Sequence, residues 1–171
     1  MSFTDLVATV ESSDTFKDFK KKNPEAFLCT GFFIIDFLTK SNKNTIDYKT
    51  DTKIVVFSLE NDEIQMQEDD ILDVSGKALT KIESFVKIEV EELRGIAGIE
   101  ILEKGYHQKF QKLIAILQNY NGEETHNEQR LIWNLTCLLD NLMIVHILVD
   151  ASSGEILKFE KKNFMDFVRK N

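Results

Sequence analysis

The chain has 171 residues, which suffices for one domain or for two small halves that share a core. Its formal net charge of −8 at pH 7 argues against non-specific nucleic-acid binding, because that binding requires a positive surface. Residues 1–15 lack the features of a signal peptide, and no segment reaches the roughly 20 apolar residues of a membrane span. The 2 cysteines are too few for a disulfide framework. We therefore expect a cytoplasmic protein with reduced thiols and no membrane or nucleic-acid partner.

The first half of the chain reads as one helix followed by a run of strands. Residues 14–22 carry Phe16 and Phe19 at helical spacing, and Asn23-Pro24 ends the segment. β-Branched and aromatic residues, or apolar residues alternating with polar ones, then predict strands over 27–37, 45–50, 53–60 and 63–68.

The second half reads as two helices followed by strands. A helix is expected from Lys77 to Gly95, with Ser75 as its cap, because its apolar residues recur at helical spacing. A second helix is expected over 106–120, where Tyr106 and Phe110 begin one apolar stripe. Strands over 131–139, 143–150 and 155–160 and a short helix over 163–169 complete the chain.

The two halves resemble each other. The stretches IVVFSLENDEI (54–64) and IVHILVDASSGEI (144–156) share an apolar strand, a short polar turn and a Glu-Ile start to the next strand. This similarity predicts an α+β fold of antiparallel β-meanders with packed helices, in two related halves. The halves would be residues 1–74 and 75–171, either as separate domains or as one fused globular unit.

The last hairpin suggests how the sheet faces are used. A two-residue turn at Asp140-Asn141 would place Trp133 opposite Leu148, with Cys137 and His146 on the same face. Both faces would then be largely apolar. A sheet of this kind needs cover on both sides, from helices or from a partner.

No pattern in the chain indicates a particular chemistry. Cys137 and His146 on one face would suggest a thiol with a base, but a buried thiol and a core-edge imidazole explain them better. The other histidines, His107 and His126, show no metal-ligand spacing, and phosphate-binding glycine motifs are absent. We expect no enzyme activity, no metal and no cofactor.

The segment 104–160 resembles PepSY-type domains, the small helix-plus-meander modules of peptidase propeptides. The residues that carry the resemblance are Val149, Asp150, Gly154, Glu155 and Ile156, preceded by LIWNLTCLL and YHQKFQKLIAIL. The resemblance implies a non-catalytic module that binds or restrains other proteins. The first half is similar to this family only through the internal repeat.

These observations predict a non-enzymatic interaction or regulatory module that binds another protein, or a second copy in a homodimer, through a sheet face. Trp133, His146 and Tyr106 are the candidate binding residues. The alternative is a small-molecule binding protein or enzyme with a pocket between helix 106–120 and the face that carries Trp133 and His146. Burial of those side chains under the helix would argue against that alternative.

Overall fold

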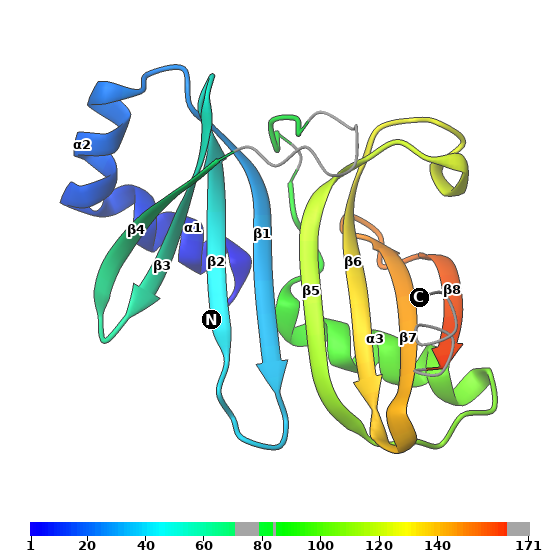
Figure 1. Cartoon of the computed structure of the whole chain (residues 1–171). Helices are drawn as coiled ribbons and strands as arrows, with labels where there is room; N and C mark the ends of the chain where they lie inside the picture. Colours follow the sequence, from blue (N-terminus) through cyan, green and yellow to red (C-terminus); the bar gives the residue numbers. More distant parts are fainter. Residues whose placement is uncertain (71–78, 84, 164–171) are drawn as a thin grey trace.

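The structure, a computed structural model, describes residues 1–70, 79–83 and 85–163. Within these residues the chain forms an 8-stranded antiparallel sheet with helices packed against it, which confirms the α+β class (Figure 1). The helices are α1 (Phe3–Ser12), α2 (Asp14–Lys22) and α3 (Val90–Glu103). The strands are β1 (Phe27–Asp36), β2 (Lys43–Lys49), β3 (Lys53–Glu60), β4 (Glu63–Asp70), β5 (Phe110–Tyr120), β6 (Arg130–Leu139), β7 (Met143–Asp150) and β8 (Ile156–Asn163).

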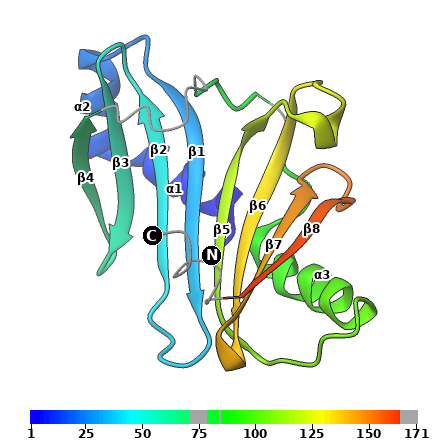
Figure 2. The same cartoon turned by 45° about the vertical axis from the view of Figure 1, so that its right-hand side comes forward.

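The sheet consists of two meanders that join at its centre. The strand order is β4-β3-β2-β1-β5-β6-β7-β8, so β1 and β5, each the first strand of its meander, lie side by side. They pair antiparallel from Gly31 opposite Leu117 to Asp36 opposite Lys112. α1 and α2 lie against the first meander and α3 against the second, all on one side of the sheet (Figures 1 and 2). The opposite face carries none of these helices.

The two N-terminal helices are capped by serines. Ser2 accepts a hydrogen bond from the Asp5 N–H, and Ser13 accepts one from the Phe16 N–H, so each satisfies a free donor in a first turn. α2 confirms the helix predicted at residues 14–22, and its Phe16 and Phe19 side chains are buried. α1 was not expected from the sequence.

An aromatic cluster connects the two halves of the molecule beneath the helices. Phe3 of α1, Phe33 of β1 and Trp133 of β6 meet edge to face, with ring centroids 5.8–6.5 Å apart. The indole Nε1 of Trp133 donates a 2.7 Å hydrogen bond to the Ile88 carbonyl oxygen. Since β1 and β6 belong to different meanders, this cluster buries aromatic surface from both.

The helix predicted over 106–120 is wrong, because residues 110–120 form β5. Apolar residues fill both alternating phases of this segment, with Leu113 and Leu117 on the helix-covered face and Ile114 and Ile116 on the other. A run of this kind fits a helical stripe and a buried strand equally well. Pairing with β1 and β6 on either side selects the strand.

The helix predicted from Lys77 is also wrong, because the described residues 79–83 and 85–88 are not helical and α3 begins at Val90. Backbone contacts hold this segment along the sheet: the Ile82 N–H donates to the Leu28 carbonyl, and the Ile88 N–H donates to the Ala151 carbonyl. Tertiary pairing therefore overrides the local helical periodicity. Asn163, the first residue of the short helix predicted over 163–169, ends β8, and the rest of that helix and Ser75 lie outside the described residues.

The predicted register of the last meander is off by one residue. The turn after β6 has three residues, Asp140–Leu142, and Asn141 and Leu142 adopt left-handed φ values of 57° and 58°. Trp133 therefore pairs with Val149, and Cys137 pairs with Val145. Because successive side chains alternate between faces, this one-residue shift moves His146 to the face opposite Trp133 and Cys137.

Candidate functional site

The open face of the sheet, the face turned away from the helices, is the main candidate site. Ile34 of β1 lies opposite Ile114 of β5, and Phe32 opposite Ile116, so four apolar side chains form a block at the centre of this face. Leu138 and Ile144, paired across β6 and β7, extend the block. We define these six half-buried residues as the apolar strip: Phe32, Ile34, Ile114, Ile116, Leu138 and Ile144.

Two further apolar residues on the open face are already covered. Leu148 of β7 lies opposite Lys158, which makes a 3.2 Å ion pair with Glu124 in the loop before β6. Leu148 is only 7% exposed, and the neighbouring Ile132 is fully buried. The apolar strip, together with Ile54 and Val56 of β3, is therefore where apolar surface on this face is left partly in contact with solvent.

Asp47 of β2 lies on the open face beside the apolar strip. It pairs with Thr30 on β1 and with Val56 on β3. Its Oδ1 atom is buried, and no donor in the described part of the chain reaches it. Burial raises the pKa of this carboxyl to about 6, and the charge of Asp69 adds to the shift, while a hydrogen bond from Thr45 opposes it. A polar atom left in this state costs free energy, which a donor from a bound partner would recover.

The two sides of the open face differ in charge. Alternation along β3 and β4 places Glu60, Glu63 and Asp69 on this face, and all three are exposed. On β8, at the opposite side of the sheet, the same face carries Lys158 and Lys162 on either side of Glu160. The open face is thus acidic toward β4 and mildly basic toward β8.

The structure does not bring the three predicted binding residues together. Trp133 is fully buried in the core, on the helix-covered face. Tyr106 follows α3, where its ring stacks on Phe159 at 6.3 Å. His146 lies on the open face, with its Nδ1 atom 3.4 Å from the Thr136 hydroxyl, and burial lowers its pKa.

The expected Trp133 and His146 face is therefore wrong, and with it the pocket placed between that face and a helix over 106–120. The expected proximity of Cys137 and His146 is wrong for the same reason, since they lie on opposite faces. Burial raises the pKa of the Cys137 thiol to about 12 and that of Cys29 to about 11. Neither thiol is activated as a nucleophile.

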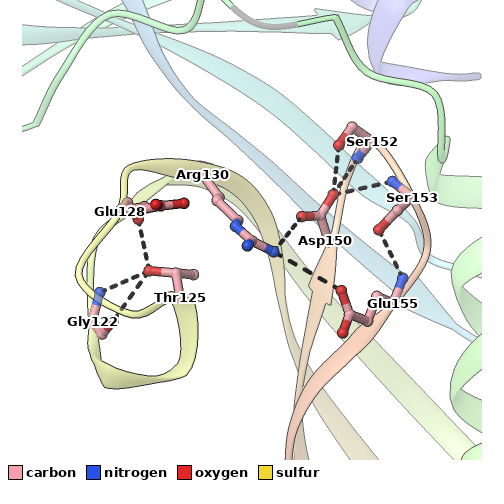
Figure 3. Close-up of polar contacts among 8 residues, drawn as sticks. All are labelled: Gly122, Thr125, Glu128, Arg130, Asp150, Ser152, Ser153 and Glu155. Carbon is pink, nitrogen blue, oxygen red and sulfur yellow. Dashed lines mark hydrogen bonds and ion pairs between the residues drawn. The ribbon is translucent and has the colours of Figure 1, made fainter.

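The turn that carries the PepSY-type motif is a compact polar structure (Figure 3). Asp150 Oδ1 accepts hydrogen bonds from the Ser152 and Ser153 N–H groups at 2.9 and 3.0 Å, and Gly154 has a φ of 78°. Arg130 lies 3.5 Å from the Asp150 carboxylate. Burial opposes ionisation of Asp150, but the serine hydrogen bonds outweigh it and lower the pKa. These contacts stabilise the turn between β7 and β8.

Sequence reasoning did not single out the apolar strip or Asp47 as functional. In TIDYKT (45–50) the alternation of Ile46 and Tyr48 with polar neighbours indicates a half-buried strand, and Asp47 then looks like an ordinary solvated residue. Only the order of the strands places Asp47 between β1 and β3, where it becomes partly buried.

Comparison with known proteins supports the fold and no particular function. No protein-family model matches the sequence, and no curated protein matches it. A crystal structure from Clostridium difficile 630, described as a "putative lipoprotein", is similar with a TM-score of 0.54 and 14% sequence identity. The likeness covers 87% of this chain and 91% of that one. At this identity it shows the fold alone. Within the described residues, no helix has the length and apolar character to span a bilayer.

Proposed function

We propose that this protein is a non-enzymatic cytoplasmic interaction module that associates through the open face of its sheet, with a second copy of the chain as its partner. The observation that carries the proposal is the apolar strip, which lies at the centre of the sheet face against which none of α1, α2 and α3 packs. Exposed apolar patches of this kind mark association surfaces. The PepSY-type resemblance of residues 104–160, and the two related helix-plus-meander halves that we infer, agree with a binding role.

The size of the open face suits a stable dimer. In the 8-stranded sheet, strands about 4.8 Å apart span about 34 Å across the face. The 7 residues of β2, at about 3.3 Å each, span about 23 Å along it. The product, about 780 Å², is close to the roughly 800 Å² that each partner contributes to a standard interface.

The charge distribution favours one arrangement of the two copies. A twofold axis parallel to the strands, lying between two facing sheets, places β4 of one copy opposite β8 of the other. The acidic side, with Glu63 and Asp69, then faces the side with Lys158 and Lys162, and this occurs twice because the interface is isologous. An axis across the strands would instead place like charges together.

Asp47 fits the same arrangement. Its position between the apolar strip and the acidic side places an unpaired carboxyl oxygen inside the surface that the partner would cover. That arrangement sets β2 opposite β6 of the second copy, where the Asn134 and Thr136 side chains on the open face carry N–H and O–H donors that would satisfy it. A purely apolar partner would leave the carboxyl buried and unpaired, at greater cost.

Sedimentation and light scattering over a concentration series test the proposal. We expect a dimer that Ile114→Lys converts to a monomer, because the substitution places a charge in the apolar strip. The matched control is Ile99→Lys, on the outer surface of α3, where Ile99 is 61% exposed. It should leave the dimer intact. Added salt should weaken the dimer.

Two results would overturn the proposal. One is a wild-type chain that stays monomeric up to about 1 mM, roughly the weakest affinity expected of a specific protein contact. The other is a dimer that Ile99→Lys disrupts and Ile114→Lys does not, which would move the interface to α3. Circular dichroism establishes that both variants are folded.

A further inference from the structure

A cavity of about 280 Å³ lies on the helix side of the sheet, between the start of α3 and the connection from β1 to β2. Its apolar walls are Phe33, Ile35, Phe37 and Val90, and Asn42 and Asn44 supply side-chain amides at its edge. Since it is on the opposite side from the apolar strip, an occupant would not compete with the dimer proposed above.

Arg94 supplies a cation to this cavity. Its guanidinium carbon lies 4.8 Å from the centre of the Phe37 ring, so the side chain is stacked on one of the cavity walls. No carboxylate of the described residues lies within ion-pairing distance of it, although acidic residues outnumber basic ones by 29 to 21 in the whole chain. Its five N–H donors are thus oriented by stacking and not engaged by an acid.

The acidic residue that lines this cavity already has a partner. Glu91 also lines the cavity, and its carboxylate makes a 3.2 Å ion pair with the amino group of Met1. Because Glu91 is already paired with a cation, the positive charge of Arg94 is left uncompensated. A carboxylate carries one charge, and its two oxygens match the planar donor fork of an arginine.

We propose that this cavity binds a small amphipathic carboxylate, with its apolar body against Phe33, Ile35 and Val90 and its carboxylate on Arg94. A liquid water molecule occupies about 30 Å³, so the cavity has room for about nine groups of that size. Octanoate, a seven-carbon alkyl chain that ends in one carboxylate, matches this size. The side-chain amides of Asn42 and Asn44 carry further N–H donors at the edge of the cavity.

Calorimetric titration of the full chain with octanoate tests the proposal. A ligand of this size should bind with a dissociation constant on the order of 0.1–1 mM. Octanol and octylammonium, whose alkyl chains are one methylene longer, should bind at least about tenfold more weakly, because they cannot pair with Arg94. Arg94→Met keeps an unbranched apolar stem against Phe37 and should also cost about tenfold or more, whereas Arg94→Lys should recover part of the loss.

The comparison of ligands needs no variant, so it is decisive even if Arg94→Met does not fold. Equal affinities for octanoate, octanol and octylammonium would overturn the proposal. An Arg94→Met variant that binds octanoate like the wild type would also overturn it. So would amide NMR shifts that change on addition of octanoate at residues of the open face and not around the cavity. Because Ile114→Lys does not alter the cavity, it should bind octanoate normally, which separates this result from the test of the dimer.

Discussion

Asp47 should make the stability of this protein fall as the pH rises through the weakly acidic range. Its pKa is raised from 3.8 to about 6 in the folded chain, chiefly by burial. Folding therefore favours the protonated form. The stabilisation is fully present below about pH 4, where the unfolded chain is also protonated, and it is lost as the pH rises through about 6.

The substitution Asp47→Asn isolates this effect, since asparagine has nearly the same shape as the protonated acid and cannot ionise. A shift of about two pKa units corresponds to about 3 kcal/mol at about 1.36 kcal/mol per unit. The side chain is only partly buried, so solvent screening reduces this figure to about 1–2 kcal/mol. We expect the variant to be more stable than the wild type by that amount at pH 7.5, and about equally stable at pH 4.

Urea unfolding followed by tryptophan fluorescence measures the difference, because Trp133 is the single tryptophan and is fully buried. Both proteins are compared at the same chain concentration, since association also stabilises the folded state. Asp36 and Glu124, whose pKa values are lowered to about 2, are present in both proteins. Their contributions to the free energy of unfolding therefore cancel in the difference. Two results would refute the reasoning. One is a difference in stability between the two proteins that is the same at pH 4 and pH 7.5. The other is a wild type that is more stable than Asp47→Asn at pH 7.5.

Three further substitutions and one labelling experiment test other features of the fold. Glu89→Gln should lower the free energy of unfolding by about 1 kcal/mol, because the Glu89 carboxylate accepts a 2.8 Å hydrogen bond from the Phe3 N–H at the start of α1. Thermal melts measure this loss of stability. In the same melts Gly154→Ala should cost about 1 kcal/mol or more, since Gly154 has a φ of 78° and its added Cβ would lie 3.3 Å from Ile88. Leu142→Gly should instead stabilise the protein by about 0.5–1 kcal/mol, because this 68% exposed leucine has a φ of 58°, which is strained for leucine and not for glycine. An unchanged melting temperature would contradict that account. Cys137 should react with a thiol reagent at neutral pH only at the rate of unfolding, and labelling at the rate of a free thiol would show that it is accessible.

Part of the fold could be predicted from the sequence because local patterns agree with the final structure. Phe16 and Phe19 at helical spacing, ended by Asn23-Pro24, leave one interpretation, and α2 forms there. The alternation around Ile46 and Tyr48 likewise marks β2, and the small polar residues after Asp150 mark the turn before β8. In these segments the local sequence preference agrees with the final structure, so no distant contact is needed to select the secondary structure.

Where two local patterns compete, only tertiary contacts decide. Residues 110–120 are apolar in both phases, and pairing with β1 and β6 makes them a strand. The three-residue turn through Asn141 and Leu142 depends on backbone angles that a leucine rarely adopts, so the sequence pointed to a shorter turn and the wrong face for His146.

The candidate site depends on tertiary structure to a greater extent than the fold does. Asp47 is a polar residue in an alternating strand until β1 and β3 enclose it. The sequence likewise does not show that Arg94, an exposed residue of α3, stacks on Phe37 at the end of β1. The sequence by itself determined that a two-faced apolar sheet would form and that some surface would have to cover it. Which face α1, α2 and α3 cover, and which they leave open, follows from strand order and register, because each one-residue shift exchanges the two faces.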